Sequence, residues 1–396
     1  MARLDPLGDF RAELRAPMRW LLLFRFISNT GVRFAYSFLD AIARGTGLSN
    51  GQLGAVLALR DLSGAAAPAV GSFAQRSGTV RVMGIGATLA TLSYFVATAG
   101  ATGFIIGMIV SGIGKIAFDV GMNTWVGDVV AYERRARASG LVELAWAAAA
   151  LVGLPLCGVL IDQFGWQAAP ALLGLAGLAP MLAINRLHGT SVAHVPVENV
   201  RLAFDRTAIG ALIGFNAMTL ASQFLIVGHG LWLDDAYGLD ATQIGLAVIS
   251  IGVIEAIAST ATATFTDALG KRRAVLGGLT LMLLACVLFV ANPSPPLALG
   301  LANLAVAFLG FEFALVSTLP LLAELDPVSR AKMLGLALGS STVMRAAGSP
   351  IGIALFDNAG WGALMLAAAV AALVAIAAIG ALVVEPATDA SIDVLN

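Results

Sequence analysis

The sequence predicts an all-α membrane protein whose twelve transmembrane helices form two pseudo-symmetric six-helix bundles. Composition is the first reason: of the 396 residues, 59% are hydrophobic and only 12% are charged. The mean hydropathy of +0.89 lies far outside the range of soluble globular proteins. The other two reasons are twelve segments near the length of about 20 residues that spans a bilayer, and a resemblance between the two halves of the chain.

The predicted spans follow one another with connections of a few residues, except at the middle of the chain. There the polar stretch 188–206 separates the sixth span from the seventh. We therefore expect an N-terminal bundle over residues 1–187, a connecting loop over 188–206 and a C-terminal bundle with a short tail over 207–396. In chain order the predicted spans are 18–43, 50–75, 80–100, 104–130, 137–162, 166–187, 207–234, 241–266, 273–292, 296–322, 331–357 and 361–384.

The basic residues predict the orientation of these spans. Most of the 23 lysines and arginines lie in the N-terminal segment and in every second loop, as at Arg76, Arg134 and Lys271. Because cytoplasmic loops carry an excess of Lys and Arg, both termini are expected to be cytoplasmic, in the inner membrane of a bacterium. The net charge of −1 gives no sign of a nucleic-acid partner. Cys157 and Cys286 lie in apolar runs and indicate neither a metal site nor a disulfide framework.

A polar stripe runs through the apolar fourth span. Ser111, Lys115, Asp119 and Asn123 recur at every fourth residue, and steps of four turn only about 40° around an α-helix. A charged group at the bilayer centre costs roughly 2.5–3.5 kcal/mol on insertion scales, so such groups face protein or a wet cavity. Two interpretations stay open: Lys115 and Asp119 neutralise each other as an internal pair, or the stripe lines a substrate or ion pathway.

The two halves share motifs at a constant spacing. Pro155, Asp162, Gly165 and Trp166 each match an identical residue 195 positions later, and the segment around Gln52 and Gly54 returns around Gln243 and Gly245. Such an internal repeat, joined by a central loop, is typical of secondary transporters, whose binding site lies at the membrane midplane between the repeats.

On these motifs the chain resembles the major facilitator superfamily over nearly its whole length. The family's loop signature after the second span appears as Gly71-Ser-Phe-Ala-Gln75-Arg76-Ser-Gly78-Thr-Val-Arg81 and, in the second half, as Ala263-Thr-Phe-Thr-Asp267-Ala-Leu-Gly270-Lys271-Arg272. The family's aspartate is therefore replaced by Gln75 in the first copy and kept as Asp267 in the second. The resemblance implies that this loop latches one conformational state, and simple topological charge is the alternative role of its basic residues.

One branch of the family is favoured by the end of the fifth span. The run from Gly158 to Trp166 is similar to that of bacterial drug and sugar exporters, which are proton antiporters. The fourth span departs from the exporter pattern, because Met108 stands where the family's arginine would precede Gly112 and Lys115 follows one turn later.

The resemblance implies that spans 1, 4, 7 and 10 line a central cavity and that spans 2, 5, 8 and 11 form its gating sides. Substrate-binding candidates are Asn29, Arg33, Tyr36, Lys115, Asn123, Asn216, Gln223 and Glu312. Proton-coupling candidates are Asp119 and Glu312, followed by Glu143 and Glu255. Gating or structural candidates are Arg60, Asp61, Arg76, Arg81, Asp267, Arg272 and Arg345.

Several of these side chains carry further expectations. Arg25 either reaches the cytoplasmic surface or continues the polar stripe of the first span. Arg60 and Asp61, which point about 100° apart on a helix, are expected to pair with different helices. His229 is expected to be an interfacial hydrogen bonder. The deep cations and carboxylates balance: Arg25, Arg33, Arg60, Lys115 and Arg345 face Asp61, Asp119, Glu143, Glu255 and Glu312.

The leading hypothesis is a monomeric, proton-coupled exporter of a small organic compound that works by alternating access without a cofactor. A second hypothesis is an organic-anion importer or exchanger with Arg33 and Lys115 as an anion clamp. A third, from another class, is a non-transporting membrane sensor. The sequence contains no phosphate-binding loop, metalloprotease motif or nucleophile elbow that would indicate an enzyme.

Overall fold

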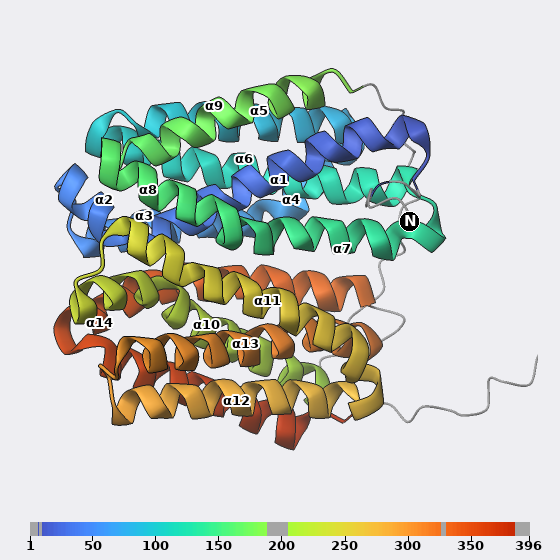
Figure 1. The fold of residues 1–396 in the computed structure, drawn as a ribbon. Helices are drawn as coiled ribbons and strands as arrows, with labels where there is room; N and C mark the ends of the chain where they lie inside the picture. Colours follow the sequence, from blue (N-terminus) through green and yellow to red (C-terminus); the bar gives the residue numbers. More distant parts are fainter. Residues whose placement is uncertain (1–6, 8–9, 188–204, 326–329, 385–396) are drawn as a thin grey trace, which may run out of the picture.

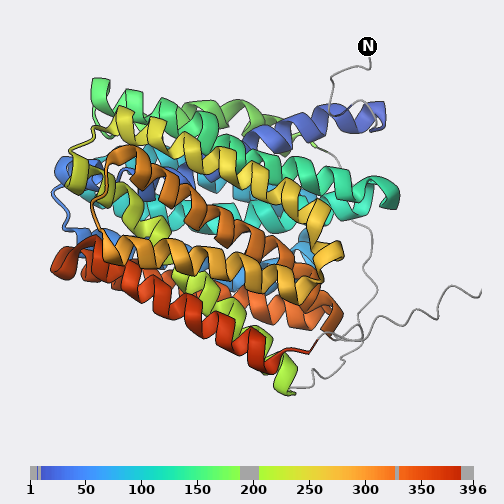
Figure 2. The same ribbon diagram turned by 60° about the horizontal axis from the view of Figure 1, so that its bottom comes forward.

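The computed structural model describes residues 7, 10–187, 205–325 and 330–384. Within this part of the chain every regular element is a helix. Figures 1 and 2 show two bundles side by side, α1 to α9 in one and α10 to α14 in the other, with helices that run between the same two ends of the molecule. Most of the predicted connecting loop lies outside the described residues, so the domain boundaries 1–187, 188–206 and 207–396 stay a prediction.

The helices of the first bundle, which we call the N half, match the first six predicted spans. They are α1 (Ala12–Ser37), α2 (Leu39–Thr46), α3 (Asn50–Leu62), α4 (Ala67–Ser77), α5 (Thr79–Ala97), α6 (Gly100–Val129), α7 (Tyr132–Ala148), α8 (Leu154–Phe164) and α9 (Ala168–Asn185). The second bundle, the C half, supplies the rest. Its helices are α10 (Arg206–Tyr237), α11 (Ala241–Leu269), α12 (Lys271–Ala291), α13 (Leu297–Leu325) and α14 (Arg330–Leu382).

The described helices confirm the twelve predicted spans. Ten helical stretches are long and apolar enough to cross a membrane. One of these, Met333–Leu382, counts as two spans because the chain turns at Gly360, whose φ is +75°. The remaining span is α1, whose several arginines make it less apolar than the other spans.

Two spans of the N half are interrupted near a proline. A 3₁₀ turn over Ser63–Ala66 joins α3 to α4, and a π turn over Ala149–Gly153 joins α7 to α8. Pro68 and Pro155 lie within the first two residues of the helices that follow. Because proline has no N–H group to donate, the preceding turn cannot keep regular α-helical hydrogen bonding.

The repeated segment around Gln52 and Gln243 has a local structural reason. In the N half, Gly47 ends α2 in the left-handed conformation, and Ser49 then begins α3 through a capping box with Gln52. The same arrangement recurs in the C half at Gly238, Asp240 and Gln243. Reciprocal bonds of this kind satisfy the free N–H groups of a helix start, so the repeat encodes matching helix boundaries.

The two ends of the molecule differ in charge, and we name them accordingly. The basic end carries Arg15, Arg76, Arg81, Arg186, Arg206 and Lys271. The acidic end carries Asp40, Asp162, Asp234, Asp240 and Asp357. In Figure 1 α2 lies at the acidic end, and the end of the molecule where α1 begins is the basic end.

Aromatic packing stiffens the C half near its acidic end. The rings of Trp232 and Trp361 stack with centroids 5.0 Å apart, and Phe289 packs against both. The indole N–H of Trp232 donates to the carbonyl of Pro293 over 2.9 Å. Stacked and edge-on aromatic pairs add stability beyond the area they bury, so the helices at this end are held as one unit.

Candidate functional site

A cavity of about 300 Å³ lies between the two halves. It is lined by α1, α3, α6 and α7 of the N half and by α10, α11, α13 and α14 of the C half. These helices belong to spans 1, 2, 4, 5, 7, 8, 10 and 11, the spans that were expected to line and gate a central cavity. Its charged lining residues are Arg25, Arg33, Asp61, Lys115, Asp119, Glu143, Glu255, Glu312 and Arg345.

On the N half, two cations share the carboxylate of Asp119. The Lys115 ammonium donates to Asp119 Oδ2 over 2.8 Å and to Asn29 Oδ1 over 3.0 Å. Arg25 of α1 forms an ion pair with the other carboxylate oxygen. The expected Lys115–Asp119 pair therefore exists, but it also lines the cavity and holds a second cation, so this cluster is not electrically neutral by itself.

A second ion pair crosses the cavity from one half to the other. Arg33 Nη1 lies 2.8 Å from Glu255 Oε2, and the Trp146 ring packs against the guanidinium with 4.8 Å between its centroid and Cζ. Because Glu255 neutralises Arg33, this arginine and Lys115 belong to separate clusters in the present conformation.

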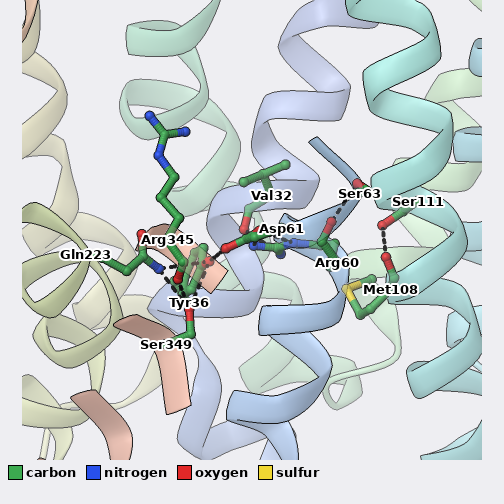
Figure 3. Close-up of polar contacts among 10 residues, drawn as sticks. All are labelled: Val32, Tyr36, Arg60, Asp61, Ser63, Met108, Ser111, Gln223, Arg345 and Ser349. Carbon is green, nitrogen blue, oxygen red and sulfur yellow. Dashed lines mark hydrogen bonds and ion pairs between the residues drawn. The ribbon is translucent and has the colours of Figure 1, made fainter. Parts of the chain in front are cut away.

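A third cluster, drawn in Figure 3, surrounds the hydroxyl group of Tyr36. The Tyr36 hydroxyl donates to Asp61 of α3 and accepts from Gln223 Nε2 of α10 over 3.0 Å. Gln223 also donates to Ser349 Oγ of α14 over 2.9 Å. Tyr36 thus joins the N half to the C half through side chains that are buried or nearly so.

The same cluster corrects one expectation. Arg60 and Asp61 were expected to pair with different helices, but they pair with each other, with 2.9 Å between Arg60 Nη2 and Asp61 Oδ1. The long arginine side chain folds back around α3 to reach its sequence neighbour. Its Nη1 also donates to the Val32 carbonyl over 3.1 Å, so the buried guanidinium is held by α1 as well.

Three charged residues of the cavity make no side-chain ion pair or hydrogen bond with any other described residue: Glu143, Glu312 and Arg345. Glu143 comes from α7, Glu312 from α13 and Arg345 from α14. The Arg345 side chain points away from Tyr36 and Ser349 in Figure 3. The cavity therefore contains both fixed ion pairs and charges that are free to meet a bound molecule.

Comparison with known proteins places this geometry in a family. The sequence model described as Major Facilitator Superfamily matches residues 21–195 and 207–393. The chain belongs to the major facilitator superfamily. Membership makes it an integral membrane transporter of small molecules and not an enzyme, and it confirms the family that the motifs resemble. No curated protein sequence matches the chain.

Solved structures with a similar fold are major facilitator transporters. The inward-open xylose transporter XylE from E. coli superposes with a TM-score of 0.77 at 14% identity, covering 94% of this chain and 97% of that one. A D-xylose–proton symporter gives 0.76 at 14% identity, over 94% and 98% of the two chains. A bacterial homolog of the human lysosomal transporter Spinster, inward-facing and occupied, gives 0.72 at 14% identity, over 93% and 94%. At this identity the likeness shows the fold alone.

Three predicted substrate-binding residues do not line the cavity of this transporter. Asn123 is exposed at the far end of the α6 stripe. Asn29 is fully buried and accepts from Lys115. Asn216 donates to Ser340 Oγ over 2.9 Å and so joins α10 to α14. The other candidates of that group line it: Arg33, Tyr36, Lys115, Gln223 and Glu312.

Two lining residues were outside the candidate lists although the sequence held a signal for them. Trp146 lies three residues after Glu143, and Phe308 lies four residues before Glu312. Residues three or four apart share a helix face, so each could have been placed beside its candidate. Arg25 was left between two roles, and it takes the one that continues the polar stripe of α1.

The loop residues predicted to gate the transporter lie at the basic end. Arg76 and Arg81 are exposed there. Arg272 donates to the backbone carbonyls of Ile379 and Gly380, near the end of α14, over 3.2 Å in the first case. The side chain of Asp267 lies outside the described residues. The gating role of these four residues stays a prediction.

At the acidic end the halves are held together by polar contacts between charged or helix-terminal groups. Arg44 lies 3.2 Å from Asp234, and Asn50 donates to Asp357 over 3.0 Å. Asp162 accepts from the backbone N–H groups of Ala241 and Thr242, over 3.2 and 2.6 Å. Between the Arg33–Glu255 pair and the basic end, no hydrogen bond or ion pair between described residues joins the two halves.

Backbone packing closes the same end. A Cβ atom added at Gly54 would lie 3.1 Å from Pro350 Cα, and one added at Gly245 would lie 3.0 Å from Pro155 Cα. Each contact pairs one half with the other, and the two contacts are related by the sequence repeat. The cavity is therefore sealed from the acidic end by a symmetric interface.

Proposed function

We propose that this transporter is a proton-coupled exporter that moves a small organic compound through the central cavity by alternating access. The observation that carries the proposal is the Glu312 carboxylate, which lies half-buried in the cavity and contacts no cation among the described residues. An ionised carboxylate in a site of low dielectric constant is costly unless a cation or a proton neutralises it. Glu312 is thus a site where proton and substrate can replace each other.

Asp119 is the second proposed coupling site. Its carboxylate is held by Lys115 and Arg25 in this conformation. A movement of α1 relative to α6 would withdraw Arg25 and leave Asp119 with a single cation. Glu143 and Glu255 follow as further candidates, because opening of the acidic end separates Glu255 from Arg33 across the halves.

Lys and Arg mark the cytoplasmic side of a membrane protein, so the basic end is the cytoplasmic end and both termini lie there. With the acidic end sealed, the described conformation is inward-facing. The substrate then enters from the cytoplasm and leaves at the acidic end once the contacts there have broken. The protein is proposed to act as a monomer in the inner membrane of a bacterium.

A second candidate function is the exchange or import of an organic anion. It is favoured by the two cations on Asp119, which leave one positive charge uncompensated within that cluster. Because Arg33 is paired with Glu255, the anion clamp would consist of Lys115 and Arg25 in this conformation. Arg33 would join it only after the halves separate.

Proteoliposomes with an internal pH indicator separate these functions. Under an imposed pH gradient, a coupled exporter moves a bound compound uphill against the direction of proton flow, and Asp119→Asn or Glu312→Gln abolishes the uphill movement. If the gradient has no effect while Arg33→Ala or Lys115→Gln stops exchange of an anion, the exporter proposal fails and the exchanger is correct.

A further inference from the structure

The charges in and behind the cavity cancel as a set but not locally. Arg60 neutralises Asp61, and Arg33 neutralises Glu255. The remaining charged groups are Arg25, Lys115, Asp119, Glu143, Glu312 and Arg345. They sum to zero, so a net-neutral ligand leaves the cavity uncharged.

The positive pole of the cavity lies on the N half. There Lys115 and Arg25 share one carboxylate, Asp119, and both cationic side chains line the cavity. The Lys115 side chain is 18% exposed. With two of its protons bonded to Asn29 and Asp119, its ammonium group has one donor left for an incoming anion.

The negative pole lies around Glu312 on the C half. Its charged neighbours are Glu255, Glu143, Arg33 and Arg345. Arg33 is already taken by Glu255, and neither Glu143 nor Arg345 contacts Glu312. Glu143, on the N half, acts on Arg25, Lys115 and Glu312 only through space, because it makes no side-chain ion pair or hydrogen bond with another described residue.

We infer that the substrate is a small zwitterion, with its anionic group on Lys115 and Arg25 and its ammonium group on Glu312. A lone anion would leave the Glu312 carboxylate without a cation, and a lone cation would leave the excess positive charge of the Lys115 cluster unanswered. A molecule that carries both groups satisfies both poles and adds no net charge to a site of low dielectric constant. The inference rests on the proposed function, and it names the substrate class of the same site.

The size of the cavity sets the size of this substrate. Its volume of about 300 Å³ equals that of roughly ten waters at about 30 Å³ each in the liquid. A compound of amino-acid size fits that space, and the phenyl rings of Phe308 and Phe311 provide apolar wall for its carbon chain.

Matched probes test the inference on the full-length protein. The zwitterions β-alanine, 4-aminobutyrate and 6-aminohexanoate are compared by calorimetric titration with butylamine and butyrate, which carry only one of the two charges. At least one zwitterion is expected to bind about tenfold or more tightly than either singly charged probe, the gain typical of one added charge-assisted hydrogen bond.

Two variants assign the poles. Glu312→Gln is expected to erase the advantage of the zwitterion over butyrate, and Lys115→Gln to erase its advantage over butylamine. Arg25→Gln replaces Lys115→Gln if that variant does not fold. Glu324→Gln is the matched control, because Glu324 lies on the same helix as Glu312 but pairs with Lys271 at the basic end; it is expected to bind as the unchanged protein does.

The inference is overturned if no probe binds, if a singly charged probe binds as tightly as every zwitterion, or if the preferences survive both variants. Flux of the bound probe into proteoliposomes then separates it from the proposed function. A zwitterion that binds in the expected pattern but does not respond to a pH gradient refutes the coupling alone. If a pH gradient drives uptake of butylamine or butyrate and no zwitterion binds, the zwitterionic substrate class is refuted and the proton coupling is not.

Discussion

Asp119 contacts two cations, so loss of the carboxylate and loss of one cation are expected to affect the stability of the protein differently. Removal of Lys115 leaves Arg25 and Asp119 as a balanced pair, whereas removal of the carboxylate leaves two cations in the cavity wall without a contacting acid. Breaking a buried pair so that a charge is left unpaired costs about 3–5 kcal/mol. Asp119→Asn is therefore expected to destabilise the protein by about 3 kcal/mol, and Lys115→Met by clearly less. Thermal unfolding in one detergent measures both, and an equal loss or the reverse order contradicts this account of the cluster.

Tyr36 couples the halves through a single hydroxyl group. Its partners Asp61 and Gln223 belong to different halves, so Tyr36→Phe removes a bridge and not only a local bond. A net hydrogen bond contributes about 1 kcal/mol, and contacting residues show coupling in a double-mutant cycle. We expect a coupling energy of about 1 kcal/mol between Tyr36→Phe and Gln223→Ala, measured by thermal unfolding. Strict additivity would show that the bridge has no energetic role.

The residue scale also shows what spacing alone can and cannot predict. Lys115 and Asp119 pair as their separation of four residues predicts. Each further step of four turns the side chain by about 40°, so three steps rotate the stripe by about 120°. Ser111 at one end is buried against the Met108 carbonyl, and Asn123 at the other end is exposed. The contact of Arg33 with Glu255 depends on the distance between two helices that are far apart in the sequence. The periodicity of polar residues along one helix gives no information about that distance.

At the scale of helices, the sequence repeat reappears as pairs of contacts. Asp162 of the N half binds the start of α11, and its repeat partner Asp357 of the C half binds Asn50 at the start of α3. Gly245 with Pro155 and Gly54 with Pro350 form a second such pair. The repeat predicted the two bundles and their helix boundaries. It did not predict that repeated residues meet across the halves, because the sequence does not specify which conformational state is populated.

These aspartates are expected to stabilise the closure of the acidic end. A carboxylate near a helix N-terminus contributes about 0.3–1 kcal/mol, so Asp162→Asn with Asp357→Asn is expected to shift the balance between the two states by roughly three- to thirtyfold. The readout is the rate at which a cysteine placed at Ser37 reacts with an impermeant maleimide added from the acidic end. An unchanged rate in the double variant contradicts this role. Glu324→Gln, at the basic end, is the control.

The fold class, the twelve spans and the family were all predictable, because they depend on hydropathy, length and repeat spacing. Placement in the cavity was predictable for charged residues such as Lys115 and Glu312, but not for Asn29, which lies near the middle of its span and is fully buried against Lys115. It failed for Arg60, whose flexible side chain reaches the neighbouring Asp61. The charge pattern of the whole cavity follows only from the packing of eight spans around it, and that packing is a property of the assembled molecule.

For the whole molecule, transport requires the acidic end to open. This means separating Asn50 from Asp357, Arg44 from Asp234 and Arg33 from Glu255 while the basic end closes. Each contact is individually weak where it is exposed, so the sealed state is able to open. The acidic-end interface is therefore expected to act as a gate that breaks in every transport cycle.

A reversible cross-link at this gate is the most direct test. Asn50 and Asp357 are replaced by cysteines and joined with a short bifunctional thiosulfonate; the native Cys157 and Cys286 are buried and stay in place. In proteoliposomes, uptake of the tightest-binding probe is expected to stop on cross-linking and to return when a reductant cleaves the link, with binding from the basic end retained throughout. Undiminished uptake by the cross-linked protein would contradict alternating access at this interface.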